Sequence, residues 1–178
     1  MPLVHHFRNL GRDTRGAEIA EAAAVLPLMF LFLLGIFWFG QAFSIYGAIT
    51  RAAQDGARAA AAPYCATCNT ANTPATNAVN AVNTSMRASK LDHARIQAPS
   101  SPQTFTACSG ASTGCTTVAG SNVCVQAPVQ ISNTSGGSTV CGASVSFQYP
   151  FQFWLPFTSL NKQRILLNAS ARVRMENQ

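Results

Sequence analysis

One long apolar run dominates the pattern of hydrophobic and polar positions along the chain. No Asp, Glu, Lys or Arg lies between Ala22 and Thr50, and residues 24–40 are close to continuously apolar. A bilayer core requires about 20 such residues, whereas the apolar part of a secretory signal has only about 7 to 15. The pattern therefore predicts a membrane-spanning helix over about residues 22–46.

The helical pattern continues well past this run. The alanine-rich stretch AITRAAQDGARAAAAP extends it to a proline, which predicts a helix over residues 17–62 with Glu18 and Glu21 in its first turn or so. Such a helix is about 69 Å long, more than twice the roughly 30 Å bilayer core, so half of it stands outside the lipid. The outer half carries a narrow apolar stripe suited to packing under a small domain: Ala48, Ile49, Ala52 and Ala59.

Three residues inside the apolar run affect how the helix bends and packs. Pro27 cannot donate a backbone hydrogen bond to Ala23, which predicts a kink or a local loosening there. Gly35 and Gly40 permit close approach of a neighbouring helix, so they are candidate partner-binding positions together with Pro27. Gly and Pro are also simply commoner in membrane helices than in soluble ones, and the sequence leaves these two interpretations open.

The pattern changes twice after the long helix. Thr73 followed by Pro74 has the residue types of a helix N-cap and first turn, and apolar residues recur at helical spacing as far as Met86, so a short helix is expected over residues 74–90. Apolar and polar positions then alternate with a period of two over three stretches: 123–131, 141–149 and 165–175. This alternation predicts an antiparallel sheet of about three to four strands that packs on the helices.

These patterns predict an α+β fold in three parts: a short basic leader (1–16), the long helix (17–62) and a small domain (63–178). Arg8, Arg12 and Arg15 precede the apolar run, whereas only Arg51 and Arg58 follow soon after it. Cytoplasmic flanks of membrane spans carry the excess of Lys and Arg. We therefore expect a single pass through the inner membrane, with the N-terminus in the cytoplasm and the C-terminal domain in the periplasm.

The cysteines agree with this topology. All six follow the apolar run, and all are disulfide candidates: Cys65, Cys68, Cys108, Cys115, Cys124 and Cys141. If AGSN (119–122) is a tight turn, Cys115 and Cys124 lie opposite each other across a hairpin, whereas Cys124 and Cys141 do not. The C-x-x-C pair Cys65 and Cys68 has the spacing of a redox pair, but it follows the end of a helix and the chain has no βαβ pattern. A structural bridge or loop clip is favoured there.

Other chemistry is not indicated. Charged residues make up only 10% of the chain, and the basic ones neither cluster nor interleave with aromatics as on a nucleic-acid-binding surface. His5, His6 and His93 do not group with other ligands, so we expect no metal site. No nucleophile triad or acid–base pair is recognisable, so we expect neither catalysis nor a cofactor.

One acid remains to be explained. Glu21 lies five residues after Gly16, which ends the basic leader, and directly before the apolar run. This spacing resembles a type IV pilin-like signal. Residues 15–62 more closely resemble TadE-like proteins of the tight-adherence (Flp) pilus system, whose signature runs from RG-x-x-x-x-E through VLPLLLLL to A-x-x-GAR-x-A. VLPL (25–28) and DGAR (55–58) match it, and LNASARVRMENQ (167–178) resembles the last strand of the family.

The resemblance implies a minor pseudopilin. A prepilin peptidase in the membrane would cut this prepilin-type leader between Gly16 and Ala17. The carboxylate of Glu21 would then attract the new N-terminal amine of a neighbouring subunit, although Glu18 offers a second acid. Its partners would be other pilins, minor pseudopilins and the inner-membrane pilus assembly platform. The resemblance leaves open whether the chain enters a surface filament or stays at its base.

Two other functions stay open at this point. The chain could be a bitopic anchor that is never processed and that carries a periplasmic binding or adhesion domain, with Glu21 a simple helix-start acid at the level of the lipid headgroups. A more distant alternative is a membrane-tethered thiol oxidoreductase that uses Cys65 and Cys68.

Overall fold

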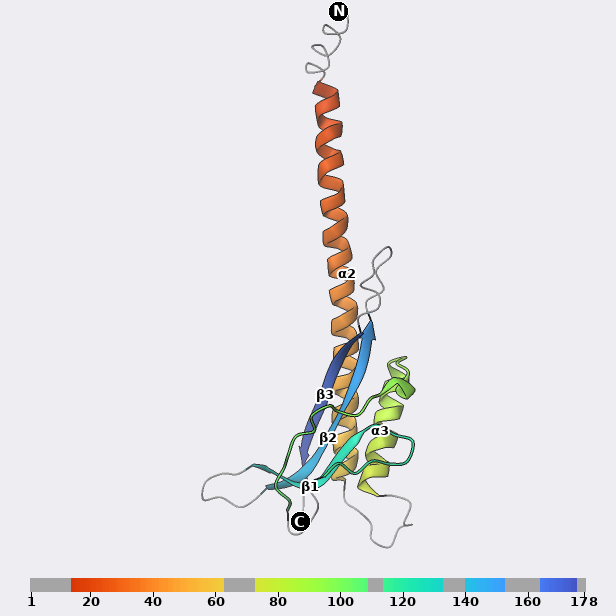
Figure 1. The fold of residues 1–178 in the computed structure, drawn as a ribbon, viewed down its shortest axis with the longest axis vertical. Coiled ribbons are helices and arrows are strands. Elements are labelled where there is room, and N and C mark those ends of the chain that lie inside the picture. Colours follow the sequence, from red (N-terminus) through yellow and green to blue (C-terminus); the bar gives the residue numbers. More distant parts are fainter. Residues whose placement is uncertain (1–13, 63–72, 109–113, 133–139, 153–163, 176–178) are drawn as a thin grey trace, which may run out of the picture. The chain divides into compact units, whose positions relative to one another are not determined.

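The computed structural model describes residues 14–62, 73–108, 114–132, 140–152 and 164–175 (Figure 1). Its elements follow in the order α2 (Thr14–Ala61), α3 (Pro74–Ala88), the 3-10 turn η2 (His93–Arg95), β1 (Cys124–Ser132), β2 (Val140–Gln152) and β3 (Arg164–Arg174). The fold class is α+β, as the sequence predicted. The chain divides into two compact units, Met1–Ala42 and Phe43–Gln178, which are described separately.

Helix α2 starts earlier than the sequence indicated. It has 48 residues, which corresponds to about 72 Å, and it begins at Thr14 rather than at Ala17. No proline lies among residues 14–16, so nothing there prevents the helix from extending into the leader, and its first turn contains no acidic residue. Glu18 therefore directly follows the first turn and Glu21 lies one turn further on, so neither acid is in the first turn itself.

The other end of α2 is set by a proline. The helix ends at Ala61, one residue before the predicted end. Ala62 precedes Pro63, and a residue before proline is disfavoured in the helical conformation. Pro27 lies inside the helix, which continues through it; a bend at that position stays a prediction.

Helix α3 begins as predicted and ends two residues early. The Thr73 side chain accepts a hydrogen bond from a backbone N–H of the first turn at 3.1 Å, which is the predicted N-cap. The helix ends at Ala88 because Lys90 adopts a left-handed backbone conformation with φ 57°. The N–H of Leu91 then reaches back to the carbonyl of Met86 at 2.9 Å, as in a Schellman motif.

The three strands form an antiparallel sheet in the order β1-β2-β3. The pairing of β2 with β3 is continuous from Gly142 opposite Arg174 to Gln152 opposite Arg164. By contrast, β1 pairs with β2 through two register shifts. Strand β2 runs to Gln152, past its predicted end at Tyr149.

The hydrophobic core of the unit Phe43–Gln178 lies between one face of the sheet and the two helices (Figure 1). Helix α2 contributes a row of buried residues at spacings of three and four, all of them small except the first: Ile49, Ala52, Ala53, Gly56, Ala57 and Ala60. The predicted stripe is correct at Ile49 and Ala52 but wrong at Ala48 and Ala59, which are only partly buried. Alanines surround this part of α2, so the contacts with α3 and the sheet, not the alanine content, determine which side is buried.

The second face of the sheet is also covered, by an extended segment that the sequence did not predict. Residues 97–108 are here called the strap. The backbone N–H of Gln97 donates to the carbonyl of Gln148, and the N–H of Gln148 donates to the carbonyl of Gln97, each at 2.8 Å. The side chain of Gln148 donates to Ser100 Oγ at 3.0 Å, and that of Gln126 donates to the Gln103 carbonyl at 3.0 Å. Gln148 and Gln126 are only 6% and 3% exposed, so both faces of the sheet are buried around them.

A disulfide fixes the end of the strap to the sheet. Cys108, the last residue of the strap, is bonded to Cys141 near the start of β2, with 6.1 Å between the two Cα atoms, a normal separation for a disulfide. Cys65 and Cys68 lie outside the described residues. The choice between a structural bridge and a redox pair at that C-x-x-C motif therefore stays open.

The hairpin expected around AGSN is present. The Ser121 N–H donates to the Val118 carbonyl at 2.9 Å, and Gly120 has φ 79°, a conformation that glycine adopts most easily. Cys115 and Cys124 are bonded across this hairpin, with 4.9 Å between their Cα atoms.

We expect the two disulfides to contribute unequally to stability. Replacing Cys108 and Cys141 by alanine should lower the free energy of unfolding by about 3–4 kcal/mol, because that bond joins residues 33 apart and the effect grows with loop length. Replacing Cys115 and Cys124, which are 9 apart, should cost about 2–3 kcal/mol. Urea unfolding of the purified, detergent-solubilised variants measures both values, and an equal or reversed order would contradict this assignment.

Candidate functional site

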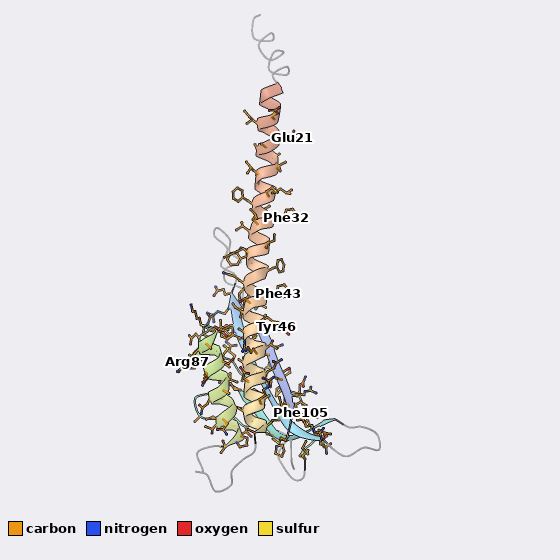
Figure 2. The ribbon with its side chains drawn as sticks, turned by 180° about the vertical axis from the view of Figure 1, so that it is seen from behind. Glu21, Phe32, Phe43, Tyr46, Arg87 and Phe105 are labelled. Atoms are coloured by element: carbon orange, nitrogen blue, oxygen red, sulfur yellow. A yellow bond between two sulfur atoms is a disulfide. The ribbon has the colours of Figure 1, made fainter. Side chains whose placement is uncertain are left out.

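The first candidate site lies near the start of α2. Gly16 and Ala17 both belong to this helix, and a Cβ added at Gly16 would meet no atom within 4 Å. Glu18 and Glu21 are exposed, and Figure 2 shows Glu21 on the helix surface. Among the described residues, neither glutamate has an ion-pair or hydrogen-bond partner. The backbone at Gly16 is thus accessible, and the Glu21 carboxylate is available to a cation from another molecule.

The two glutamates lie close together on the helix. They are three positions apart, a spacing that places side chains next to each other on a helical surface, where like charges disfavour one another. A cation brought to this position would relieve that repulsion. Residues 18–21 of α2 therefore carry two negative charges directly before the apolar run.

The apolar run forms an uncovered surface in the described structure. Its large aliphatic and phenylalanine side chains are 43% to 72% exposed from Val25 to Phe43, whereas Trp38 is partly buried. Phe32 is one of the exposed side chains drawn in Figure 2. A helix that is apolar on all sides requires lipid or other apolar helices around it. In the described part of the chain, α2 is the one helix whose length and composition suit a membrane crossing, so the chain is compatible with single-pass anchoring.

The length of the charge-free run fits a whole bilayer. Ala22 to Thr50 contains 29 residues without Asp, Glu, Lys or Arg, which corresponds to about 44 Å of helix. A bilayer including its headgroup regions is about 40–45 Å thick. A continuous helix of this length is therefore long enough to cross a bilayer.

Gly35 contributes to an apolar groove on the membrane part of α2. The groove has a volume of about 560 Å³ and is lined by Leu28, Leu31, Phe32, Gly35, Ile36 and Phe39. Added Cβ atoms at Gly35 and Gly40 would meet open space within this unit, so both glycines leave room on the helix surface. Binding of a partner helix at Gly35, Gly40 and Pro27 stays a prediction.

The second candidate feature is the DGAR motif (55–58), which lies within the unit Phe43–Gln178. Gly56 is buried where α2 meets α3 and β2: a Cβ added there would lie 2.6 Å from Val82 Cγ2 and 3.5 Å from Val145 Cγ1. Only a residue without a side chain fits this contact without displacing a neighbour. The sequence showed this motif as part of a family signature, but it did not indicate which neighbours the glycine contacts.

The polar residues of the motif also have structural partners. The Asp55 carboxylate accepts a hydrogen bond from Ser85 Oγ of α3 at 2.9 Å. Arg58 Nη1 lies 3.9 Å from Asp55 Oδ1, with the arginine side chain 72% exposed, so this ion pair contributes little. The motif therefore joins the C-terminal part of α2 to α3 and the sheet.

The prediction that the chain binds no metal and catalyses no reaction stays untested. The described residues contain no group of three or more His, Cys, Asp or Glu side chains that could hold a metal ion. His93 lies in η2, with its Nε2 atom 3.4 Å from Arg87 Nη2. Our expectation that the chain binds no metal or cofactor and catalyses no reaction thus rests on the sequence.

Comparison with known proteins identifies the segment that holds both features. No curated protein and no solved structure matches the chain. Residues 16–58 match the model of one protein family, described as TadE-like protein. The match begins at the glycine before Glu21, includes the apolar run and ends with the DGAR motif. The resemblance to TadE-like proteins of the tight-adherence system is thereby confirmed over residues 16–58.

Proposed function

We propose that this chain is a minor pseudopilin that helps to initiate or support assembly of a tight-adherence pilus, and through it adherence to surfaces. The observation that carries the proposal is the spacing of Gly16 and Glu21 directly before a charge-free run of α2 whose large aliphatic and phenylalanine side chains are exposed. A plain membrane anchor does not need an acid at a fixed distance from a glycine. The family match over the same residues supports this choice.

In the proposed topology the N-terminus is cytoplasmic and residues 63–178 are periplasmic. Arg8, Arg12 and Arg15 before the apolar run favour a cytoplasmic N-terminus. The bonded cysteines of the C-terminal domain favour an oxidising compartment for that domain. Two independent properties, charge and cysteine oxidation, therefore support the same orientation in the inner membrane.

In the proposed mechanism a prepilin peptidase cuts between Gly16 and Ala17 and so creates a new amine. Glu21 of one subunit then pairs with the amine of a neighbouring pilin or pseudopilin. This attraction is strong because the dielectric constant is low inside the membrane. The assembly platform extracts the paired subunits, and the apolar surface of α2 packs against neighbouring helices. No step of this mechanism requires catalysis or a cofactor from the chain itself.

The proposal is tested by changing the cleavage position. In cells with an active prepilin peptidase, Gly16→Phe should accumulate as the longer, unprocessed chain, because the peptidase must approach the backbone closely at that residue. Surface pili should then be lost, while insertion into the membrane stays normal. Immunoblots of membrane fractions and piliation assays measure these effects, with Gly16→Ala as the control that keeps the residue small. If Gly16→Phe and the parent chain have equal electrophoretic mobility on the immunoblot, the result would argue for a bitopic anchor without processing.

A further inference from the structure

The two outer edges of the sheet differ in how they are covered. The edge of β1 is paired by two short bridges, Thr116 with Val125 and Ala107 with Val129. The disulfide from Cys108 in the strap and the one across the 115–124 hairpin hold the segments that make these bridges. Backbone groups on the outer edge of β1 at Val125, Pro128 and Gln130 therefore have partners within the domain.

The edge of β3 has no such cover in the described part of the chain, since no strand pairs with it there. Proteins usually protect an exposed edge with a bulge, a proline, charged side chains or a very short strand, and of these β3 has only charged side chains, its arginines. Strand β3 has 11 residues and no proline, and its register with β2 has no shift. This edge is thus long and regular enough to pair with another strand.

The direction of the backbone groups along β3 follows from one hydrogen bond. The Met175 N–H donates to the Cys141 carbonyl at 3.0 Å, so it points toward β2. Successive N–H groups of a strand point to opposite sides, and β3 is continuous with this residue. The N–H groups of Asn168, Ser170 and Arg172 therefore point away from β2, toward the open edge.

Charge determines which strand could pair there. Strand β3 contains Arg164, Arg172 and Arg174 and no acidic residue. Residues 43–178 as a whole contain nine Lys or Arg and three Asp or Glu. Two antiparallel copies of β3 in full register would place Arg164 opposite Arg174 at both ends, and like charges in directly opposite positions are destabilising. The edge is better matched to a strand with acidic side chains than to a second copy.

We propose that the open edge of β3 binds an extended acidic segment of another protein, which adds a strand to the sheet. Main-chain hydrogen bonds would supply the affinity, as in other strand-addition complexes. Arg164 and Arg174 would favour acidic partners. This interaction goes beyond the proposed role in pilus assembly and does not depend on cleavage at Gly16.

A synthetic peptide of the length of β3, with Glu alternating with Val, serves as the probe. Amide hydrogen exchange is measured by NMR on the isotope-labelled whole chain in neutral detergent. The amides of Asn168, Ser170 and Arg172 should exchange at least tenfold more slowly when the peptide is present. A peptide with Lys in place of Glu should have no effect. A peptide with Pro in place of Val should also have none, because it keeps the acids but lacks the alternate backbone donors.

Two variants separate backbone pairing from simple charge attraction. Ser170→Pro removes an N–H that points outward and leaves the hydrogen bonds to β2 in place, so peptide binding should weaken at least tenfold, whereas Ser170→Ala should bind normally. Arg174→Glu keeps every backbone donor and should also weaken binding, which covers the case that the proline variant does not fold. The proposal is wrong if the Pro-containing peptide protects equally, if no peptide protects the edge, or if the chain alone forms dimers through β3.

Discussion

Glu21→Gln is expected to abolish piliation while membrane insertion and cleavage stay normal. In the proposed assembly, Glu21 neutralises the amine of a neighbouring subunit inside the membrane. Glutamine has nearly the same size but no charge, so the amine would lose its counter-charge. Breaking a buried ion pair in this way costs roughly 3–5 kcal/mol, which corresponds to a loss of assembly of more than a hundredfold. Counts of surface pili and adherence measure the effect, with immunoblots to check abundance and processing.

Glu18→Gln is the matched control for this substitution. Glu18 lies on the same helix three positions earlier and is also exposed. If it interacts only with the helix dipole, its loss costs about 0.3–1 kcal/mol and piliation barely changes. Should Glu21→Gln assemble pili as well as the parent chain, Glu21 would have no more than that same minor role. A severe Glu18→Gln phenotype with a mild Glu21→Gln phenotype would exchange the roles of the two acids.

Gly56→Leu is expected to destabilise the C-terminal domain by about 3 kcal/mol, at the upper end of what overpacking of a core costs. A Cβ at this position would already lie 2.6 Å from Val82 Cγ2 and 3.3 Å from the Ala78 carbonyl oxygen. Val82 is β-branched and fully buried, so it has little freedom to move aside. Urea unfolding of the detergent-solubilised chain measures the loss.

Gly47→Leu is the control, because it makes the same chemical change on the same helix. Gly47 is exposed, and an added Cβ there would meet no atom within 4 Å. Replacing a helical glycine without a clash should be neutral or should stabilise by up to about 1 kcal/mol. Equal stability of Gly56→Leu and Gly47→Leu would show that Gly56 does not make the close contact with Val82 described above.

Local chemistry explains which parts of the fold the sequence could predict. The start of α3 follows from Thr73 and Pro74, whose effects act within one turn. The strands follow from alternation, which needs no knowledge of their partners. The position of Glu21 at the start of the apolar run likewise depends only on the order of residues along the chain.

The features that the sequence did not predict depend on contacts between distant residues. The strap has no periodic pattern, and its place is determined by hydrogen bonds to Gln126 and Gln148, which are far from it in the sequence. The buried side of α2 is surrounded by alanines, so hydrophobicity alone could not distinguish Ala57, which is buried, from Ala59, which is not. The close contact at Gly56 becomes visible only once α3 and β2 are placed beside it.

The account depends most on the claim that the chain is processed as a prepilin. The most direct test is the intact mass and N-terminal sequence of the chain recovered from membranes of cells with an active prepilin peptidase. We predict a chain that begins at Ala17, and the same chain beginning at Met1 in cells that lack the peptidase. A chain that keeps Met1 when the peptidase is active would contradict the account and would leave Glu21 as an ordinary acid near the start of a membrane anchor.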